Sequence, residues 1–311
     1  GDEVIMPSFT FTSTANAVVL RGAVPVFIDI TPQTMNMDIK HIEPAITPKT
    51  KAIYVVHYAG VACDMHSIQA LAQNYNLKIV EDAAQCLFAY YQDKPLGTFG
   101  DIGTFSFHGT KNVTAGEGGA ISINTSSYRQ AADLIKDKGT NRQAFLNGVA
   151  DYYTWYTVGS SYVMSEFSSA YLFAQLEEGE KITSLRRQNW QRYFQELASL
   201  EEAGFLKRPQ VPAQCYHNAH IFFILLPTPE QVDRIQTALK EQGVQANRHY
   251  TPLHKAPAGH RYGRPGSCRK NTEFYAERLL RLPVHTGVTP NIQDKVLECI
   301  KTVIKEHPVS F

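Results

Sequence analysis

The sequence has 311 residues, of which 43% are hydrophobic and 19% are charged, and its formal net charge is +1. This is the composition of an ordinary globular protein with enough apolar material for a core. The near-neutral balance gives no electrostatic reason to expect nucleic acid or a membrane as a partner, and no apolar run is long enough to span a bilayer.

Short apolar segments alternate with helical patterns in the first half of the chain. We expect strands at 4–6, 24–28, 52–56 and 78–81, and helices at 14–20, 38–46 and 66–75. The strands are continuously apolar, as in sheets that are covered on both faces. Strands that take turns with helices predict an α/β fold with a mostly parallel central sheet.

The second half has a different pattern. Two further strands, at 102–107 and 119–123, precede a long helical stretch at 165–200, and the remainder predicts a strand at 219–226 and helices at 229–242 and 291–305. We therefore expect a large domain over residues 1–180 and a smaller α+β domain over residues 181–311.

Cysteine usage gives no sign of a disulfide framework or a zinc site. The five cysteines are widely scattered and form no CxxC pair: Cys63, Cys86, Cys215, Cys268 and Cys299. This distribution fits a reducing compartment such as the cytoplasm, and we expect no metal.

An acidic pair, Glu81-Asp82, ends one predicted strand and leads into Ala83-Ala84-Gln85. Ligands of open parallel sheets bind beyond the carboxyl ends of the strands. Asp82 could simply cap the next turn. Alternatively, it could pair with the protonated ring nitrogen of a bound cofactor, which needs a carboxylate to stay charged.

Lys111 follows the strand at 102–107 and is succeeded by the glycine-rich segment 116–119. A lysine in such a position is usually exposed. Here small and hydroxyl residues surround it, and the glycines allow close approach of the backbone to a ligand. A lysine that forms a covalent bond with a carbonyl needs a lowered pKa, which partial burial supplies.

Aromatic residues follow two other strands. Phe9 is expected in the core, whereas Phe11 could lie flat against a planar ring. His57 could be a core histidine or could line the same crevice, and the sequence does not distinguish these alternatives.

In their order and spacing, these motifs resemble the DegT/DnrJ/EryC1/StrS sugar aminotransferase family. The motifs are 81–85, Ser106-Phe107-His108, Lys111-Asn112 and 116–119, and the resemblance covers essentially the whole chain. It implies a fold-type I enzyme that uses pyridoxal 5'-phosphate and works as a homodimer with its active site at the interface.

The resemblance also assigns roles to residues. It makes Lys111 the catalytic lysine that holds the cofactor and shuttles protons. Asp82 would pair with the ring nitrogen, Gln85 would hydrogen-bond the ring hydroxyl, Phe11 would stack on the ring and Ser106 would contact the phosphate.

The second half resembles the branch of the family that makes dTDP-4-amino-4,6-dideoxygalactose. The motifs are 159–162, 175–177, 218–220, 249–254, 257–259 and 277–283. This implies L-glutamate as donor, dTDP-4-dehydro-6-deoxy-glucose as acceptor, and a product for surface polysaccharide such as enterobacterial common antigen. His249, Tyr250 and His254 would line the sugar pocket or pack at the interface.

The sequence departs from the family at two places. Many members carry an asparagine that reaches the cofactor phosphate across the dimer interface, and Ser161 stands there in this chain. The family's main phosphate-binding turn precedes the segment that opens this chain at Gly1, so we expect several dozen further residues upstream. Helix capping is the role expected for Ser13 or Thr14.

Three alternatives remain. Dehydratase members of the family have histidine where Lys111 stands, which argues against dehydration. A 3-keto sugar nucleotide is a possible acceptor in place of the 4-keto one. A truncated, non-catalytic scaffold is the alternative from another class, although the presence of both Lys111 and Asp82 argues against it.

Overall fold

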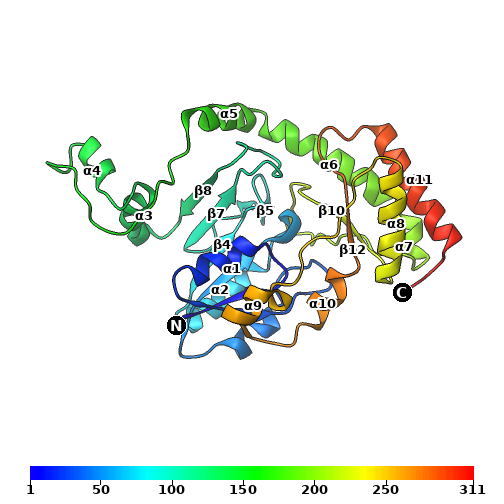
Figure 1. Cartoon of the computed structure of the whole chain (residues 1–311), viewed down its shortest axis with the longest axis horizontal. Helices are drawn as coiled ribbons and strands as arrows, with labels where there is room; N and C mark the ends of the chain where they lie inside the picture. Colours follow the sequence, from blue (N-terminus) through cyan, green and yellow to red (C-terminus); the bar gives the residue numbers. More distant parts are fainter.

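The computed structural model describes all residues, 1–311, and is built around a seven-stranded sheet (Figure 1). The strands are β1 (Glu3–Pro7), β2 (Val24–Ile28), β3 (Thr50–Val56), β4 (Lys78–Asp82), β7 (Ile102–Ser106), β8 (Gly119–Ile123) and β11 (Arg264–Pro265). Their order is β11-β2-β1-β3-β4-β7-β8, and only the β7–β8 pair is antiparallel. The predicted α/β fold with a mostly parallel sheet is confirmed.

Apolar side chains from the inner strands form the core on both faces of the sheet. One cluster of 21 buried residues joins the strands to α2 (Met65–Asn74), and a smaller one packs α1 (Thr12–Val19) against the other face. The helix expected at 38–46 is instead two short 3₁₀ turns, η1 (Ile39–His41) and η2 (Glu43–Ala45). Pro44 has no N–H to donate, so a continuous α-helix cannot run through it.

The long helix expected at 165–200 is three helices: α5 (Glu166–Glu177), α6 (Gly179–Glu196) and α7 (Ala198–Glu202). The break before α6 brings Gly179 against the ring of Phe88, where a Cβ atom would lie 2.3 Å from a ring carbon. A side chain at this position would force the Phe88 ring to move, so the tertiary packing favours glycine at the break.

The second layer of the molecule lies at the right in Figure 1. Strand β10 (Phe222–Leu225) pairs antiparallel with β12 (Leu279–Leu282), and α6, α8 (Pro229–Glu241) and α11 (Pro290–Glu306) cover the pair. A cluster of 22 buried residues forms its own core. No helix of the chain combines the length and hydropathy that a bilayer crossing requires.

The C-terminal part of the chain also returns to the large sheet. After η5 (Leu253–Lys255) and α9 (Pro257–Tyr262), strand β11 pairs parallel with β2, and α10 (Lys270–Ala276) follows. Arg264 of β11 donates to both carboxylate oxygens of Glu3, at 2.7 and 2.5 Å. A single boundary at residue 180 therefore does not describe which residues pack on which sheet.

An arm projects from the far edge of the sheet, at the left in Figure 1. It holds the short turn η4 (Ser126–Tyr128), α3 (Arg129–Lys136), α4 (Arg142–Leu146) and an extended segment that leads to α5. A separate small sheet joins β5 (Tyr90–Tyr91) to β6 (Lys94–Pro95) and β9 (Cys215–Tyr216). The sequence patterns predicted neither the arm nor this sheet.

Candidate active site

An open cleft of about 750 Å³ lies at the carboxyl ends of β3, β4 and β7. This is where ligands of open α/β sheets bind. It brings together seven of the residues predicted from the sequence: Phe11, Asp82, Gln85, Ser106, Lys111, His249 and Tyr250. Three others do not line it: His57, His254 and Ser161.

Asp82 ends β4 and points into the cleft. Its Oδ1 accepts from the backbone N–H of Ala84 at 3.2 Å, so it does cap the next turn. Its Oδ2 accepts from the hydroxyl of Thr14 at 2.7 Å and also borders the cleft. The two interpretations of Asp82 are therefore compatible, because each uses a different oxygen.

Thr14 is a site residue that the sequence interpretation missed. Helix α1 begins at Thr12 and its N-cap is Phe11, which makes no side-chain capping bond. Ser13 and Thr14 therefore lie inside the helix, and the capping role expected for them is wrong. Thr14 instead orients Asp82, and its hydroxyl also lies 2.9 Å from that of Thr10.

Lys111 lies in the loop after β7 and borders the same cleft. Burial lowers the pKa of its amine, and the nearby charge of Asp82 only partly opposes this effect. Loss of hydration disfavours the charged form of a lysine. A larger share of neutral amine results, which nucleophilic attack on a carbonyl requires.

His249 and Tyr250, in the loop between α8 and η5, line the same cleft as Lys111. Gln85 accepts from the N–H of Ala59 at 2.6 Å and donates to the hydroxyl of Tyr250 at 2.7 Å. The ring of Tyr250 stacks on that of His249, with centroids 3.6 Å apart. Gln85 is thus held in one orientation at the cleft floor.

The imidazole of His249 remains neutral at physiological pH. Burial lowers its pKa to about 2, and the positive charges of Arg281 and Lys111 contribute in the same direction. Its Nδ1 lies 2.8 Å from the hydroxyl of Tyr58. His249 can therefore hydrogen-bond in the cleft but cannot supply a positive charge there.

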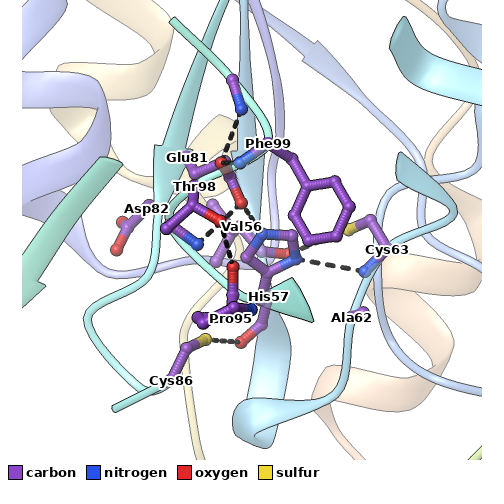
Figure 2. Close-up of polar contacts among 12 residues, drawn as sticks. Val56, His57, Ala62, Cys63, Glu81, Asp82, Cys86, Pro95, Thr98 and Phe99 are labelled. Atoms are coloured by element: carbon purple, nitrogen blue, oxygen red, sulfur yellow. Dashed lines mark hydrogen bonds and ion pairs between the residues drawn. The ribbon is translucent and has the colours of Figure 1, made fainter. Parts of the chain in front are cut away.

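His57 is a core histidine and does not line the cleft. Figure 2 shows its contacts with Glu81 and Cys63. Its side chain is fully buried, and its Nε2 lies 2.9 Å from Glu81 Oε2. Its Nδ1 accepts from the N–H of Cys63 at 3.1 Å, so the proton must reside on Nε2 and point at Glu81. Of the two alternatives for His57, the structure selects the core.

His254 also lies outside the cleft. Its Nδ1 is 2.6 Å from the hydroxyl of Ser8, which is fully buried, and its Nε2 is 2.9 Å from Glu273. These contacts join η5 to β1 and α10. The substrate-binding role considered for His254 is replaced by a structural one, because both ring nitrogens are already used.

Ser161 is exposed on the projecting arm, where it forms a bridge with Asp137. It lies outside the cleft of its own chain. A contact from Ser161 to the cofactor of a second chain stays a prediction.

Phe11 and the polar set fit a flat, cationic heteroaromatic ring. The Phe11 side chain is 58% exposed although it borders the cleft, which leaves its face free for stacking. A carboxylate, an amine with lowered pKa and an amide converge on the same space. These are the groups that would hold the ring of pyridoxal phosphate.

Comparison with known proteins agrees with this chemistry. The family model described as the DegT/DnrJ/EryC1/StrS aminotransferase family matches residues 1–301. An uncharacterised protein of Methanocaldococcus jannaschii is 32% identical, over 98% of this chain and 80% of its own length.

Solved structures share the fold over nearly the whole chain. An aminotransferase from Psychrobacter cryohalolentis has a TM-score of 0.91 at 29% identity, with 98% of this chain and 82% of that one covered. A family member from Brucella abortus has a TM-score of 0.87 at 28% identity, with 97% and 79% covered.

A third similar structure bears on the cofactor. A putative sugar aminotransferase from Streptococcus pneumoniae, 25% identical, has been solved in two forms, and each matches 98% of this chain. The PLP-form has a TM-score of 0.87 with 81% of that chain covered, and the PMP-form has a TM-score of 0.88 with 82% covered. The expected pyridoxal phosphate cofactor is confirmed at the level of the family. The chain belongs to the DegT/DnrJ/EryC1/StrS aminotransferase family.

Proposed function

We propose that this sugar aminotransferase moves the amino group of L-glutamate to C4 of dTDP-4-dehydro-6-deoxy-glucose. The product would be dTDP-4-amino-4,6-dideoxygalactose, a precursor for surface polysaccharide such as enterobacterial common antigen. The observation that carries the aminotransferase chemistry is the convergence of Lys111, Asp82 and Phe11 on one cleft at the carboxyl edge of the sheet. The donor, the acceptor and the nucleotide rest on the resemblance of the second half of the chain.

Each residue has a role in this proposal. Pyridoxal phosphate, when bound, supplies an aldehyde that takes up the amino group and a ring that withdraws electrons. Lys111 takes the proton from the α-carbon of glutamate as a general base and later returns it as an acid. Asp82, oriented by Thr14, keeps the ring nitrogen protonated, Gln85 binds the ring hydroxyl, Phe11 covers one ring face and Ser106 contacts the phosphate.

The reaction divides into two half-reactions. Glutamate leaves its amino group on the enzyme and departs as 2-oxoglutarate, and the keto sugar then takes up that group and departs as the amino sugar. Lys111 serves both halves, because in each one it takes a proton from one carbon atom as a base and delivers it to another as an acid before that half-reaction ends. Ping-pong kinetics are expected.

The arm supports the further proposal of a homodimer with its active site at the interface. Large apolar side chains of the arm and of α5 are exposed, among them Trp155 at 74%, Val158 at 70% and Phe167 at 91%. Many exposed large apolar side chains on one segment are typical of an interaction site. Ser161 lies on the same arm, so in a dimer it could reach the cleft of the partner.

A single substitution tests the aminotransferase proposal. The purified protein mixed with pyridoxal phosphate should gain an absorption band of the lysine-bound cofactor, and Lys111→Ala should lose both the band and turnover. Turnover should fall by about 100- to 10,000-fold, the contribution typical of a positioned acid–base group. Lys240→Ala, an exposed lysine on α8, is the matched control.

The acceptor is tested separately. Glutamate with the 4-keto dTDP sugar should give product, whereas 3-keto sugar nucleotides should react more slowly. A band that survives Lys111→Ala would refute the role of Lys111, and faster turnover of a 3-keto sugar would refute the choice of acceptor alone.

A further inference from the structure

A second polar cavity, of about 600 Å³, lies between the Lys111 loop, β12 and α11. It adjoins the active-site cleft, since Thr110 and Arg281 line both spaces. The volume falls within the range of about 300–1,000 Å³ that is usual for small-molecule sites. A ligand that starts beside Lys111 could therefore extend past Arg281 into this cavity.

The lining of the second polar cavity is basic. Its side chains include Arg281, Lys295 and His285, and none of the 13 lining residues is acidic. The nearby Asp294 lies on the same helix, but its carboxylate is bound to Arg192 at 2.5 Å. The uncompensated charge in the cavity is therefore positive, which favours an anionic ligand.

Arg281 stands where the two spaces meet and lacks a protein partner for its charge. Its Nε is buried and has no hydrogen-bond partner. The one hydrogen bond that its side chain makes is a long contact of 3.4 Å from the guanidinium to the carbonyl of Arg248. A buried N–H donor without a partner is costly, so its retention on the half-buried Arg281 at a cavity neck points to an anion that a ligand supplies.

The backbone holds Arg281 in this position. Strand β12 pairs with β10, and Arg281 also exchanges backbone hydrogen bonds with Asn247, at 2.8 and 3.3 Å. Asn247 itself lines the second polar cavity. The planar guanidinium suits phosphate oxygens, which it can bind through two parallel N–H groups.

We infer that the second polar cavity binds the phosphate groups of the acceptor substrate, with Arg281 at its neck and Lys295 beyond it. The inference rests on the proposed function, in which the acceptor is a sugar carried by a nucleoside diphosphate. A carboxylate of the amino donor has similar chemistry. However, glutamate is too small to fill both the cleft and the second polar cavity, so the phosphates are the better match in size.

Equilibrium titration of the cofactor-loaded protein tests this assignment. The probes are dTDP, UDP and inorganic pyrophosphate, and the variants are Arg281→Gln and Lys295→Gln. Arg281→Gln should weaken dTDP binding about 10- to 100-fold, as expected for lost hydrogen bonds to a charged group. Lys295→Gln should weaken it about two- to fivefold, because Lys295 is exposed. Lys305→Gln, an exposed lysine farther along α11, is the matched control and should bind dTDP normally.

The glutamate half-reaction distinguishes the two sources of anion. It is followed in a single turnover by the change in cofactor absorbance, without any sugar nucleotide. Relative to the wild type, the fold loss of dTDP affinity in Arg281→Gln should exceed the fold reduction in the rate of this half-reaction. The reverse result would assign Arg281 to the donor carboxylate and overturn the inference.

The remaining outcomes are also decisive. If the wild-type protein reacts with glutamate but binds neither dTDP, UDP nor pyrophosphate, the inference fails while the proposed function stands. If the lysine-bound cofactor band is absent, the proposed function fails whatever the titration shows. If Arg281→Gln does not fold, as judged by thermal melting, the comparison of Lys295→Gln with Lys305→Gln decides, and equal dTDP affinity in these two would overturn the inference.

Discussion

Glu81 and Asp82 are adjacent carboxylates at the end of β4, yet they serve opposite faces of the sheet. Glu81 is fully buried, and it accepts from the backbone N–H groups of Gly97, Phe99 and Gly100 at 2.6–2.8 Å as well as from His57 at 2.9 Å. Asp82 is half-buried, and its Oδ2, which Thr14 orients, borders the cleft.

The difference shows how the same chemical group becomes structural or functional. Burial raises the pKa of Glu81, but the hydrogen bond from His57 and those from the backbone donors outweigh it and lower the pKa overall. The carboxylate of Glu81 is thus fully used, because it accepts three hydrogen bonds from the 97–100 turn and one from His57 (Figure 2). Asp82 keeps acceptor capacity that a ligand can use.

The sharpest way to test the contrast is to neutralise each acid in turn. Asp82→Asn should lower turnover about 100- to 1,000-fold, the usual cost of one preorganised electrostatic contact. Its unfolding midpoint in urea should stay close to that of the wild type. Steady-state kinetics and urea unfolding of the same samples measure both quantities.

Glu81→Gln should behave in the opposite way. In glutamine, an NH2 group replaces one of the two carboxylate oxygens. Gly97 and His57 donate to one of these oxygens, and Phe99 and Gly100 donate to the other. In either orientation of the amide, two N–H donors would therefore face an NH2 group that cannot accept. The free energy of unfolding should drop by about 2–6 kcal/mol, since each of the two buried donors left unsatisfied costs about 1–3 kcal/mol. If Glu81→Gln unfolds like the wild type and Asp82→Asn does not, the contrast is wrong.

His57 provides the next test, with a smaller effect. His57→Leu removes one donor to Glu81 but leaves the three backbone donors, so the free energy of unfolding should fall by about 1–3 kcal/mol, the cost of one unsatisfied buried group. The KM values for both substrates should change less than about twofold, since fully buried His57 does not line the cleft.

His260→Leu, an exposed histidine in α9, is the control for packing and solubility. A large rise in KM for the His57 variant, with unchanged stability, would return His57 to the binding site.

The smallest effect concerns Lys111 in protein freed of cofactor. Burial lowers its folded pKa below the unfolded value of about 10.4, so the folded state binds the proton less well than the unfolded state does. Keeping Lys111 protonated in the folded state therefore lowers the free energy of unfolding. This loss of stability is complete below the folded pKa and disappears as the pH rises past about 10.4.

Lys111→Met should therefore raise the free energy of unfolding at neutral pH and lose that advantage in strong base. Urea unfolding at several pH values measures the change, with Lys240→Met as the exposed control. If the increase in the free energy of unfolding does not depend on pH, then packing, and not the charge of Lys111, is responsible for it.

The sequence by itself determined the sheet and much of the cofactor-facing site. Continuous apolar segments predicted the parallel strands, because strands covered on both faces have no polar side. The ends of those strands then predicted that Asp82, Gln85 and Lys111 would share one edge. The period of two along a strand also requires Glu81 and Asp82 to face opposite ways.

Only the tertiary structure decided which face was open. The alternation of side chains along β4 is the same whether Glu81 or Asp82 faces the cleft. The local sequence of the 97–100 turn also gives no sign that this turn covers Glu81. Likewise, His57 and His254 could be assigned only once Cys63, Glu81, Ser8 and Glu273 were seen beside them.

Arg281 was beyond the reach of local patterns for the same physical reason. It comes from β12, 170 positions after Lys111, and lies at the cleft because the second layer packs over the sheet. Local propensity fixes strands and turns, but contacts between distant segments depend on packing that no short window of sequence contains.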